Sequence, residues 1–96
     1  MITLSQFEAH RRRLLELLTE HAYERREITL ASGRRSDFYI DCRQVVLGAE
    51  GHWLVGWLFC RLIERHAPDV AAVGGVSIGA DPLVSATSLM SGFGSK

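Results

Sequence analysis

The stretch Val70-Ala-Ala-Val-Gly-Gly-Val-Ser-Ile-Gly-Ala-Asp-Pro82 decides the expected fold class. Its first four residues are apolar without polar alternation, a pattern typical of a strand buried on both faces of a parallel sheet. A glycine-rich turn follows. Asp81 and Pro82 then mark the start of a helix, because aspartate is a good N-cap and proline suits the first helical position. The stretch therefore predicts strand, loop and helix, the unit from which α/β proteins are built.

A second helix is predicted just before this unit. Residues 50–66 carry leucines at every fourth position, which places them on one stripe of a helix. The apolar surface around that stripe is wider than one core contact requires, so we expect other elements to cover it on more than one side. If the rest of a sheet is absent, Trp53, Trp57 and Phe59 should form an exposed apolar patch and promote self-association.

The N-terminal part of the chain also has the pattern of a helix, over residues 5–26. Ser5 and Glu8 have the spacing of a capping box. A run of three arginines at 11–13 is compatible with a phosphate-binding patch, but the glutamates around it favour an exposed helix face. The apolar residues that recur at helical spacing on the predicted inner face are Phe7, Leu14, Leu15, Leu18 and Ala22.

Residues 27–47 change character and predict a hairpin. Ile28-Thr29-Leu30 and Phe38-Tyr39-Ile40 are β-type runs, and the polar connection between them contains Gly33. The connection brings two arginines and two serines close to the aromatic pair. Aromatic rings beside guanidinium and hydroxyl donors suit a planar, anionic heterocycle, and the candidate residues are Arg34, Ser36, Phe38 and Tyr39. A solvated hairpin with both rings tucked into the core is the alternative, and composition alone favours it.

The glycine-rich turn is the second candidate site. Backbone N–H groups at the start of a helix attract anions, and the candidates here are Ser77, Ile78, Gly79 and Ala80. Gly75 and Gly79 would let the backbone approach a phosphate closely. The spacing is neither that of a dinucleotide-binding fingerprint nor that of a P-loop. Glycines that merely turn the chain over a sheet edge remain the alternative.

Length and composition exclude several classes of protein. With 96 residues the chain has room for one domain, and its formal net charge of +0 argues against nucleic-acid binding. The longest apolar run, residues 53–60, is too short to span a bilayer, so no membrane partner is expected. Cys42 and Cys60 lack metal-ligand spacing and a partner motif, which predicts two reduced thiols in a cytoplasmic protein and no metal ligands.

Two strings together resemble a known family over about residues 5–89. They are Leu30-Ala-Ser-Gly-Arg-Arg-Ser-Asp-Phe-Tyr-Ile-Asp-Cys-Arg43 and Ala72-Val-Gly-Gly-Val-Ser-Ile-Gly-Ala-Asp-Pro82, and they resemble the N-terminal part of orotate phosphoribosyltransferase. The resemblance implies an α/β chain that forms the opening portion of a type I phosphoribosyltransferase fold. Within one incomplete domain, 1–96, we expect an N-terminal helix over 5–26 and a hairpin hood over 27–47. The start of the core, with a helix, a first core strand, the Gly-rich loop and a further helix, would cover 50–90, and 91–96 would be a frayed tail.

The resemblance also implies an activity. Enzymes of this family transfer ribose 5-phosphate from phosphoribosyl pyrophosphate to N1 of orotate, with Mg²⁺, and they are homodimers with shared active sites. The hairpin residues would cover the orotate ring, and residues 76–80 would meet the pyrophosphate. Ala31 stands where many relatives carry a lysine, Ile40 where many carry a second aromatic residue, and Ile78-Gly79 where some carry Tyr-Lys. Binding at residues 76–80 would therefore rest on backbone donors.

The family's catalytic loop and its ribose-phosphate motif would come after residue 96. We therefore expect no catalytic residue within these residues and interpret the chain as a truncated enzyme that is inactive by itself. A non-catalytic fragment, or a ligand-binding or dimerisation module of the same fold, is the alternative. A third interpretation is a phosphoribosyltransferase that acts on a purine or uracil, but the sequence 30–43 of the hairpin disfavours it.

Overall fold

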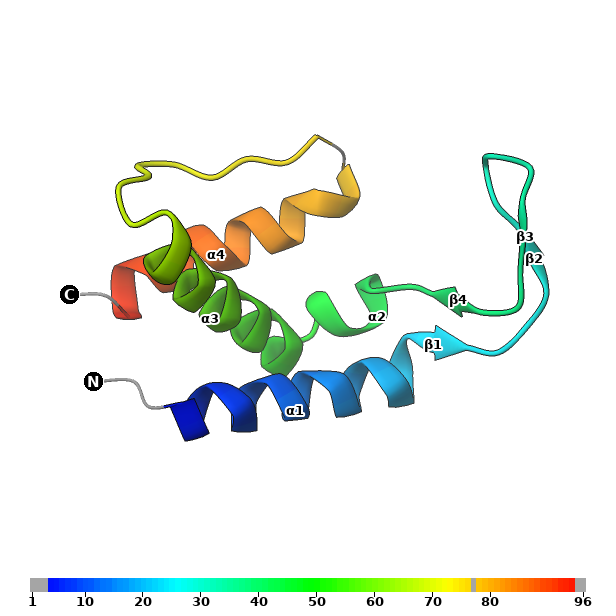
Figure 1. Cartoon of the computed structure of the whole chain (residues 1–96), viewed down its shortest axis with the longest axis horizontal. Helices are drawn as coiled ribbons and strands as arrows, with labels where there is room; N and C mark the ends of the chain where they lie inside the picture. Colours follow the sequence, from blue (N-terminus) through cyan, green and yellow to red (C-terminus); the bar gives the residue numbers. More distant parts are fainter. Residues whose placement is uncertain (1–3, 77, 95–96) are drawn as a thin grey trace.

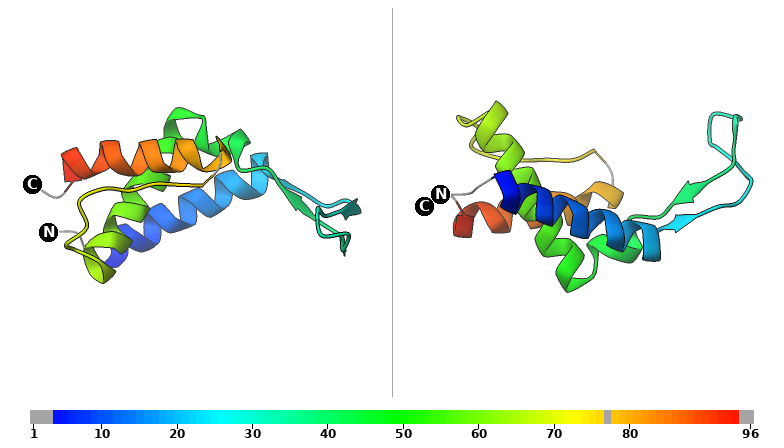
Figure 2. Two further views of the ribbon diagram at one scale, coloured as in Figure 1. Left: turned by 90° about the horizontal axis from the view of Figure 1, so that it is seen from above. Right: turned by 60° about the horizontal axis from the view of Figure 1, so that its bottom comes forward.

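The structure is a computed structural model that describes residues 4–76 and 78–94. Three long helices form a layered helical part, and a narrow arm of short strands projects from one end of it (Figures 1 and 2). The molecule is elongated as a result, with extents of 45 × 28 × 23 Å. In chain order the elements are α1 (Leu4–His21), β1 (Tyr23–Glu24), β2 (Ile28–Thr29), β3 (Arg35–Ser36), β4 (Tyr39–Ile40), α2 (Arg43–Val46), α3 (Ala49–His66), the 3-10 turn η1 (Ile78–Ala80) and α4 (Asp81–Gly94).

Helix α3 is the centre of the helical part, and its bounds confirm the helix predicted over 50–66. It packs between α1 on one side and α4 on the other, so its wide apolar surface is covered on more than one side, as expected. Gly56 brings α4 close, since a Cβ at this position would lie 2.4 Å from the carbonyl oxygen of Ala86. The buried side chains form two clusters: Leu17, Ala22, Val45 and Leu54, and Trp57, Leu58, Cys60 and Met90.

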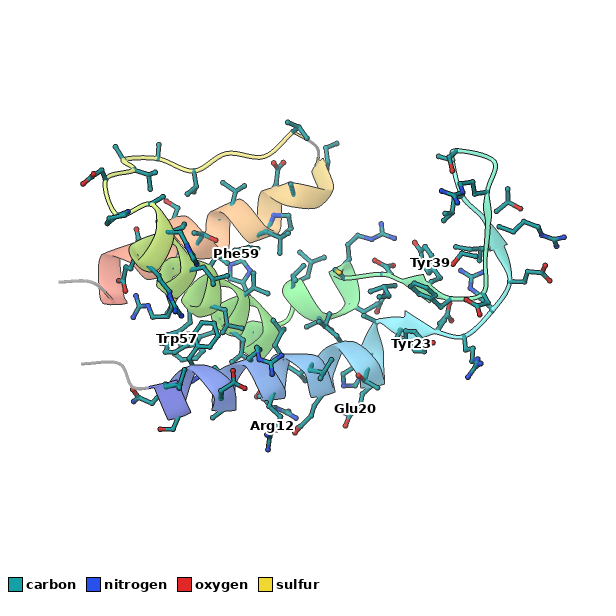
Figure 3. The ribbon with its side chains drawn as sticks, in the orientation of Figure 1. Arg12, Glu20, Tyr23, Tyr39, Trp57 and Phe59 are labelled. Carbon is teal, nitrogen blue, oxygen red and sulfur yellow. The ribbon has the colours of Figure 1, made fainter. Side chains whose placement is uncertain are left out.

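Trp57 is buried, although it was expected to be part of an exposed apolar patch. Its exposed fraction is 8%, because the Phe7 and His10 side chains of α1 cover it, with ring centroids 6.2 and 4.2 Å away. Figure 3 shows the indole between α1 and α3. Trp53 and Phe59, the other two residues of the expected patch, are 43% and 41% exposed. Burial of Trp57 depends on where α1 docks, which the spacing within α3 does not reveal.

The predicted bounds and inner face of α1 need three corrections. The helix begins at Leu4, so Ser5 lies within its first turn and does not precede it. It ends at His21, well before residue 26, because the next residues enter strand β1. Leu15 is 57% exposed, whereas Leu17 is buried. The face that docks on α3 is therefore rotated from the predicted one, although most of its apolar residues were identified correctly.

The arginine run of α1 forms ion pairs on an exposed face. Arg11 bonds to Glu8, and Arg13 bonds to both Glu16 and Glu50. The two bonds from Arg13 to Glu50, at 2.7 and 2.9 Å, join α1 to α3. These pairs support the interpretation of an exposed, charge-balanced helix face, rather than a phosphate patch.

Residues 70–73, predicted as the first core strand, form no strand. Val70 and Val73 are 52% and 36% exposed, and residues 67–76 run as irregular backbone beside α3 and α4 (Figure 1). A strand in a sheet needs a neighbour to satisfy its N–H and C=O groups. Within the described residues no other strand lies next to this segment, since the two ladders of the molecule both belong to the arm.

Helix α4 begins at Asp81, as predicted, and follows directly on η1. It continues to Gly94, so the prediction of a frayed tail from residue 91 is wrong at least as far as Gly94; residues 95–96 lie outside the described residues. Met90, 8% exposed, packs with Trp57 of α3 and holds the last turns of the helix. In the described part of the chain, none of the helices combines the length and apolar character that crossing a membrane requires.

The arm contains two short antiparallel ladders instead of one hairpin. β2 pairs with β3, with Ile28 opposite Ser36, and the tight turn between them has Gly33 at a φ of 88°. The predicted hairpin would pair β4 with β2. Instead β4 pairs with β1, so that Tyr39 lies opposite Glu24. The tight turn closes the β2–β3 pair early and leaves residues 39–40 to pair further down the arm. The short helix α2, which lies within the predicted hood of 27–47, then returns the chain to the helical part.

Candidate functional site at the arm and the 78–80 turn

The β1–β4 ladder places the two aromatic candidates on opposite faces. Tyr23 lies opposite Ile40, and its ring stacks on Phe38 with a centroid distance of 6.0 Å and an interplanar angle of 22°. Side chains alternate between the faces of a strand, so Tyr39 lies on the other face, with Glu24. Figure 3 shows Tyr23 and Tyr39 at the base of the arm. A single flat ligand on this ladder therefore contacts one of the two candidate rings.

Tyr39 already has a cation on its ring. The guanidinium carbon of Arg26 lies 5.0 Å from the ring centroid. Arg26 Nε donates to Glu24 Oε2 at 2.8 Å, and Glu24 is the residue opposite Tyr39 in the ladder. The sequence analysis did not identify Arg26. Residues 24 and 26 are two positions apart, so in an extended chain their side chains lie on the same face. This spacing would have identified Arg26 only if β1 had been recognised as the partner of β4.

The other hairpin candidates lie at different points along the arm. The Ser36 hydroxyl donates to the carbonyl oxygen of Phe38 at 3.0 Å, so it supports the bend before β4. Arg34 lies in the turn of the other ladder, where its carbonyl oxygen accepts the N–H of Leu30 at 2.8 Å. Phe38 is 45% exposed, which contradicts the alternative in which both rings are tucked into the core.

The junction between arm and helices is held by an ion pair. Both carboxylate oxygens of Asp41 accept from the Arg43 guanidinium at 2.9 Å, and one also accepts the Arg43 N–H at 3.1 Å. The hydrogen bond from the Arg43 side chain is the main reason that the pKa of Asp41 is lowered. This contact orients β4 where it enters α2.

Both cysteines are free, as predicted. Cys42 is exposed beside this junction, and Cys60 is buried between α3 and α4. The Cys60 thiol donates to the carbonyl oxygen of Thr87 at 3.2 Å, and burial raises the pKa of this thiol. The raised pKa keeps Cys60 in its neutral form, which suits a packing role.

The second candidate site, at the glycine-rich turn, is open to solvent on its outer side. Ile78 is 87% exposed, and Ser77 lies outside the described residues. Gly75 has a packing reason to be glycine, because a Cβ there would lie 2.6 Å from the Cβ of Ala80. The inner side of the turn borders a groove of about 260 Å³, lined by Phe59, Ile63, Val73, Gly74, Gly75, Ala80, Leu83, Val84 and Thr87. Thr87 is the one polar residue among the described residues of this lining, and its hydroxyl already donates to the carbonyl oxygen of Leu83, so a phosphate would have to lie on the outer side of Ile78, Gly79 and Ala80.

The two candidate sites are at the same end of the helical part. In all three ribbon views, η1 lies toward the end from which the arm projects (Figures 1 and 2). In residues 4–76 and 78–94, no three or more His, Cys, Asp or Glu side chains gather into a group that could hold a metal ion. The described residues of the two candidate sites carry aromatic rings, guanidinium groups and backbone N–H donors.

Comparison with known proteins extends this picture. No protein-family model matches the chain. The orotate phosphoribosyltransferase of Sorangium cellulosum is 51% identical over 83 residues, which are 86% of this chain and 43% of that enzyme. That of Thermosynechococcus vestitus is 48% identical over 81 residues, 84% of this chain and 41% of the enzyme. The chain is a homologue of part of the orotate phosphoribosyltransferases.

Solved structures of orotate phosphoribosyltransferase match the fold as well. The crystal structure of the Mycobacterium tuberculosis enzyme in complex with Fe(III) dicitrate superposes with a TM-score of 0.69 at 35% identity, over 81% of this chain and 45% of that chain. A second crystal structure of this enzyme, with inorganic phosphate, gives a TM-score of 0.66. The expected opening portion of a phosphoribosyltransferase fold is confirmed as a whole, although residues 70–73 do not form the core strand that was part of it. The chain spans less than half the length of these orotate phosphoribosyltransferases.

Proposed function

We propose that the protein containing this chain is a glycosyltransferase of pyrimidine biosynthesis that makes orotidine 5′-phosphate and pyrophosphate from orotate and phosphoribosyl pyrophosphate. The observation that carries the proposal is the 51% identity to an orotate phosphoribosyltransferase over 86% of the chain. The agreement in fold with the Mycobacterium tuberculosis enzyme supports it independently of the curated sequences.

The arm would bind orotate in this proposal. Tyr39 offers its ring for stacking, and Phe38 on the other face of the ladder, with Ser36 and Arg34, shapes and supports the hood. Orotate is planar and anionic, so an aromatic ring next to guanidinium groups suits it. The exposure of the arm supports this role, because a ligand can reach the rings without opening the helical core.

The turn before α4 would bind the pyrophosphate part of the second substrate. The backbone of Ile78, Gly79 and Ala80 leads directly into this helix of 14 residues, and Ser77 precedes them in the sequence. The positive end of a helix dipole and its free N–H groups favour an anion at such a place. Asp81 opposes an anion directly at the helix end, so the phosphates fit better on the N–H groups that precede it.

Mg²⁺ would enter with phosphoribosyl pyrophosphate. Magnesium commonly keeps several waters and is held by substrate phosphates with one or two carboxylates, so it does not require a protein cage. That chemistry fits a turn whose contribution is backbone donors. When bound, the ion would neutralise charge on the departing pyrophosphate.

We further place the protein in the cytoplasm as a homodimer. The two free thiols support a reducing compartment. The Trp53 and Phe59 side chains support association, since each leaves a large aromatic surface exposed that contact with another chain would bury. The same side chains favour a second candidate function, a dimerisation module without catalysis of its own.

An orotate-consumption assay with phosphoribosyl pyrophosphate and Mg²⁺ tests the proposed function. The whole protein that contains these residues should turn over, with the Sorangium cellulosum enzyme as positive control. The 96 residues alone should not, because loss of several transition-state contacts of about 3 kcal/mol each removes many decades of rate. If the whole protein forms no orotidine 5′-phosphate, the proposed function is wrong. Turnover by residues 1–96 within tenfold of the control would show that the catalytic groups lie within them.

A further inference from the structure

The arginines of the arm and its junction differ in what holds them. Arg35 pairs with Glu27, and Arg43 gives two side-chain hydrogen bonds to Asp41. Arg26 is held by a single hydrogen bond through Nε, which leaves its two terminal nitrogens to bind an anion. Of these arginines, Arg26 is the one whose guanidinium lies over the Tyr39 ring.

The hydrogen bond of the Arg26 side chain to Glu24 is exposed to solvent. The side chain of Arg26 is 55% exposed, and that of its partner Glu24 is 61% exposed, so water can replace their hydrogen bond at little cost. A flat ligand that stacks on this face of Tyr39 meets the guanidinium at once. A guanidinium that swings from the ring to the ligand's edge then presents its planar pair of N–H groups to a carboxylate, a geometry that favours two parallel hydrogen bonds.

We infer that Arg26 determines specificity for a carboxylated pyrimidine by binding the carboxylate of an orotate ring stacked on Tyr39. The inference rests on the proposed function and adds to it the group that distinguishes orotate from a neutral pyrimidine. In the unliganded molecule, Glu24 and Tyr39 hold Arg26 next to the place where the carboxylate arrives. A neutral ring of the same shape would gain the stacking contact but not the ion pair.

Calorimetric binding of orotate and of its neutral carboxamide to the whole protein tests this role. Arg26→Gln should weaken orotate binding about tenfold, the loss typical of a hydrogen bond to a charged group, and leave carboxamide binding unchanged. Arg26→Lys should restore part of the affinity, because it returns the charge without the planar pair of donors. Arg25→Gln is the matched control, since it removes the same charge from the neighbouring exposed position and should alter neither affinity.

The outcomes separate the two proposals. If the unaltered protein binds orotate and Arg26→Gln keeps the same preference for orotate over the carboxamide, the role of Arg26 is wrong while the proposed function stands. Equal weakening of both ligands would also overturn the role, because it would show that Arg26 only supports the ladder. If the unaltered protein binds neither ligand, the proposed function itself fails. An unchanged amide NMR spectrum outside the arm would show that the Arg26→Gln protein is folded.

Discussion

The helical part of the molecule buries its apolar side chains, whereas every residue of the arm from 23 to 40 is exposed or half-buried. Helix α3 alone contributes eight buried residues. The arm relies on ring stacking, ion pairs such as Arg35–Glu27, and two short ladders. Close packing resists deformation, but exposed pairs exchange readily with water. The helical part therefore supplies most of the stability, and the arm can rearrange at a lower cost in free energy.

The largest expected effect is on the helical part. Gly56→Val should lower the free energy of unfolding by about 3 kcal/mol, because the new side chain would collide with the backbone of α4 at Ala86. Urea unfolding, followed by the fluorescence of the buried Trp57, measures the loss. Gly92→Ala in α4 is the control, because its Cβ would meet nothing within 4 Å and alanine favours a helix by up to about 1 kcal/mol. Equal stability of the two variants would contradict the close contact between α3 and α4.

A smaller effect should remain within the arm. Gly33→Ala should destabilise the β2–β3 ladder by about 1–2 kcal/mol, because Gly33 has a φ of 88° that alanine adopts poorly. Amide hydrogen exchange should become faster at Thr29 and Arg35, while the urea midpoint of the whole molecule stays the same. A shift of that midpoint comparable to the one for Gly56→Val would show that arm and helices unfold together.

The binding contribution of Tyr39 should be smaller still. Tyr39→Ala in the whole protein should weaken orotate binding by about 0.5–1.5 kcal/mol through loss of the aromatic contact. It should leave phosphoribosyl pyrophosphate binding nearly untouched, because that substrate would bind at the 78–80 turn. Titration calorimetry with each substrate measures both affinities, and Gly79→Val should show the reverse pattern. An unchanged orotate affinity would mean that Tyr39 only packs against Arg26.

The smallest effect concerns pH at the junction. The Arg43 guanidinium lowers the pKa of Asp41 in the folded protein, so this pair stabilises the fold fully above the ordinary pKa of aspartate. The stabilisation is lost as the pH falls through the lowered folded-state pKa. Carboxyl NMR should show Arg43→Gln returning the pKa of Asp41 toward 3.8, with little change in overall stability at neutral pH. A pKa that did not rise in this variant would contradict the pairing.

Much of the helical part was predictable from local signals. The periodicity of residues 50–66 located α3 to within one residue, and Asp81 with Pro82 located the start of α4. Capping and periodicity act through neighbours within a few positions in the chain, so the sequence carries them directly. The sequence also makes Tyr39 a candidate, because an aromatic residue next to arginines and serines suits a flat anion, and this role stays a prediction.

The tertiary structure alone decided which segments meet. The pairing of β4 with β1 sets Tyr23 opposite Ile40 and Glu24 opposite Tyr39, in a register that the strand sequences do not specify. The same pairing brings Arg26 over the ring of Tyr39. Residues 70–73 have the composition of a buried strand, yet they lack a neighbouring strand among the described residues and stay irregular. Trp57 is buried because α1 docks on it. The local sequence sets the preferred conformation of each segment. Strand pairing and burial also depend on which strand or helix of the rest of the chain lies next to that segment.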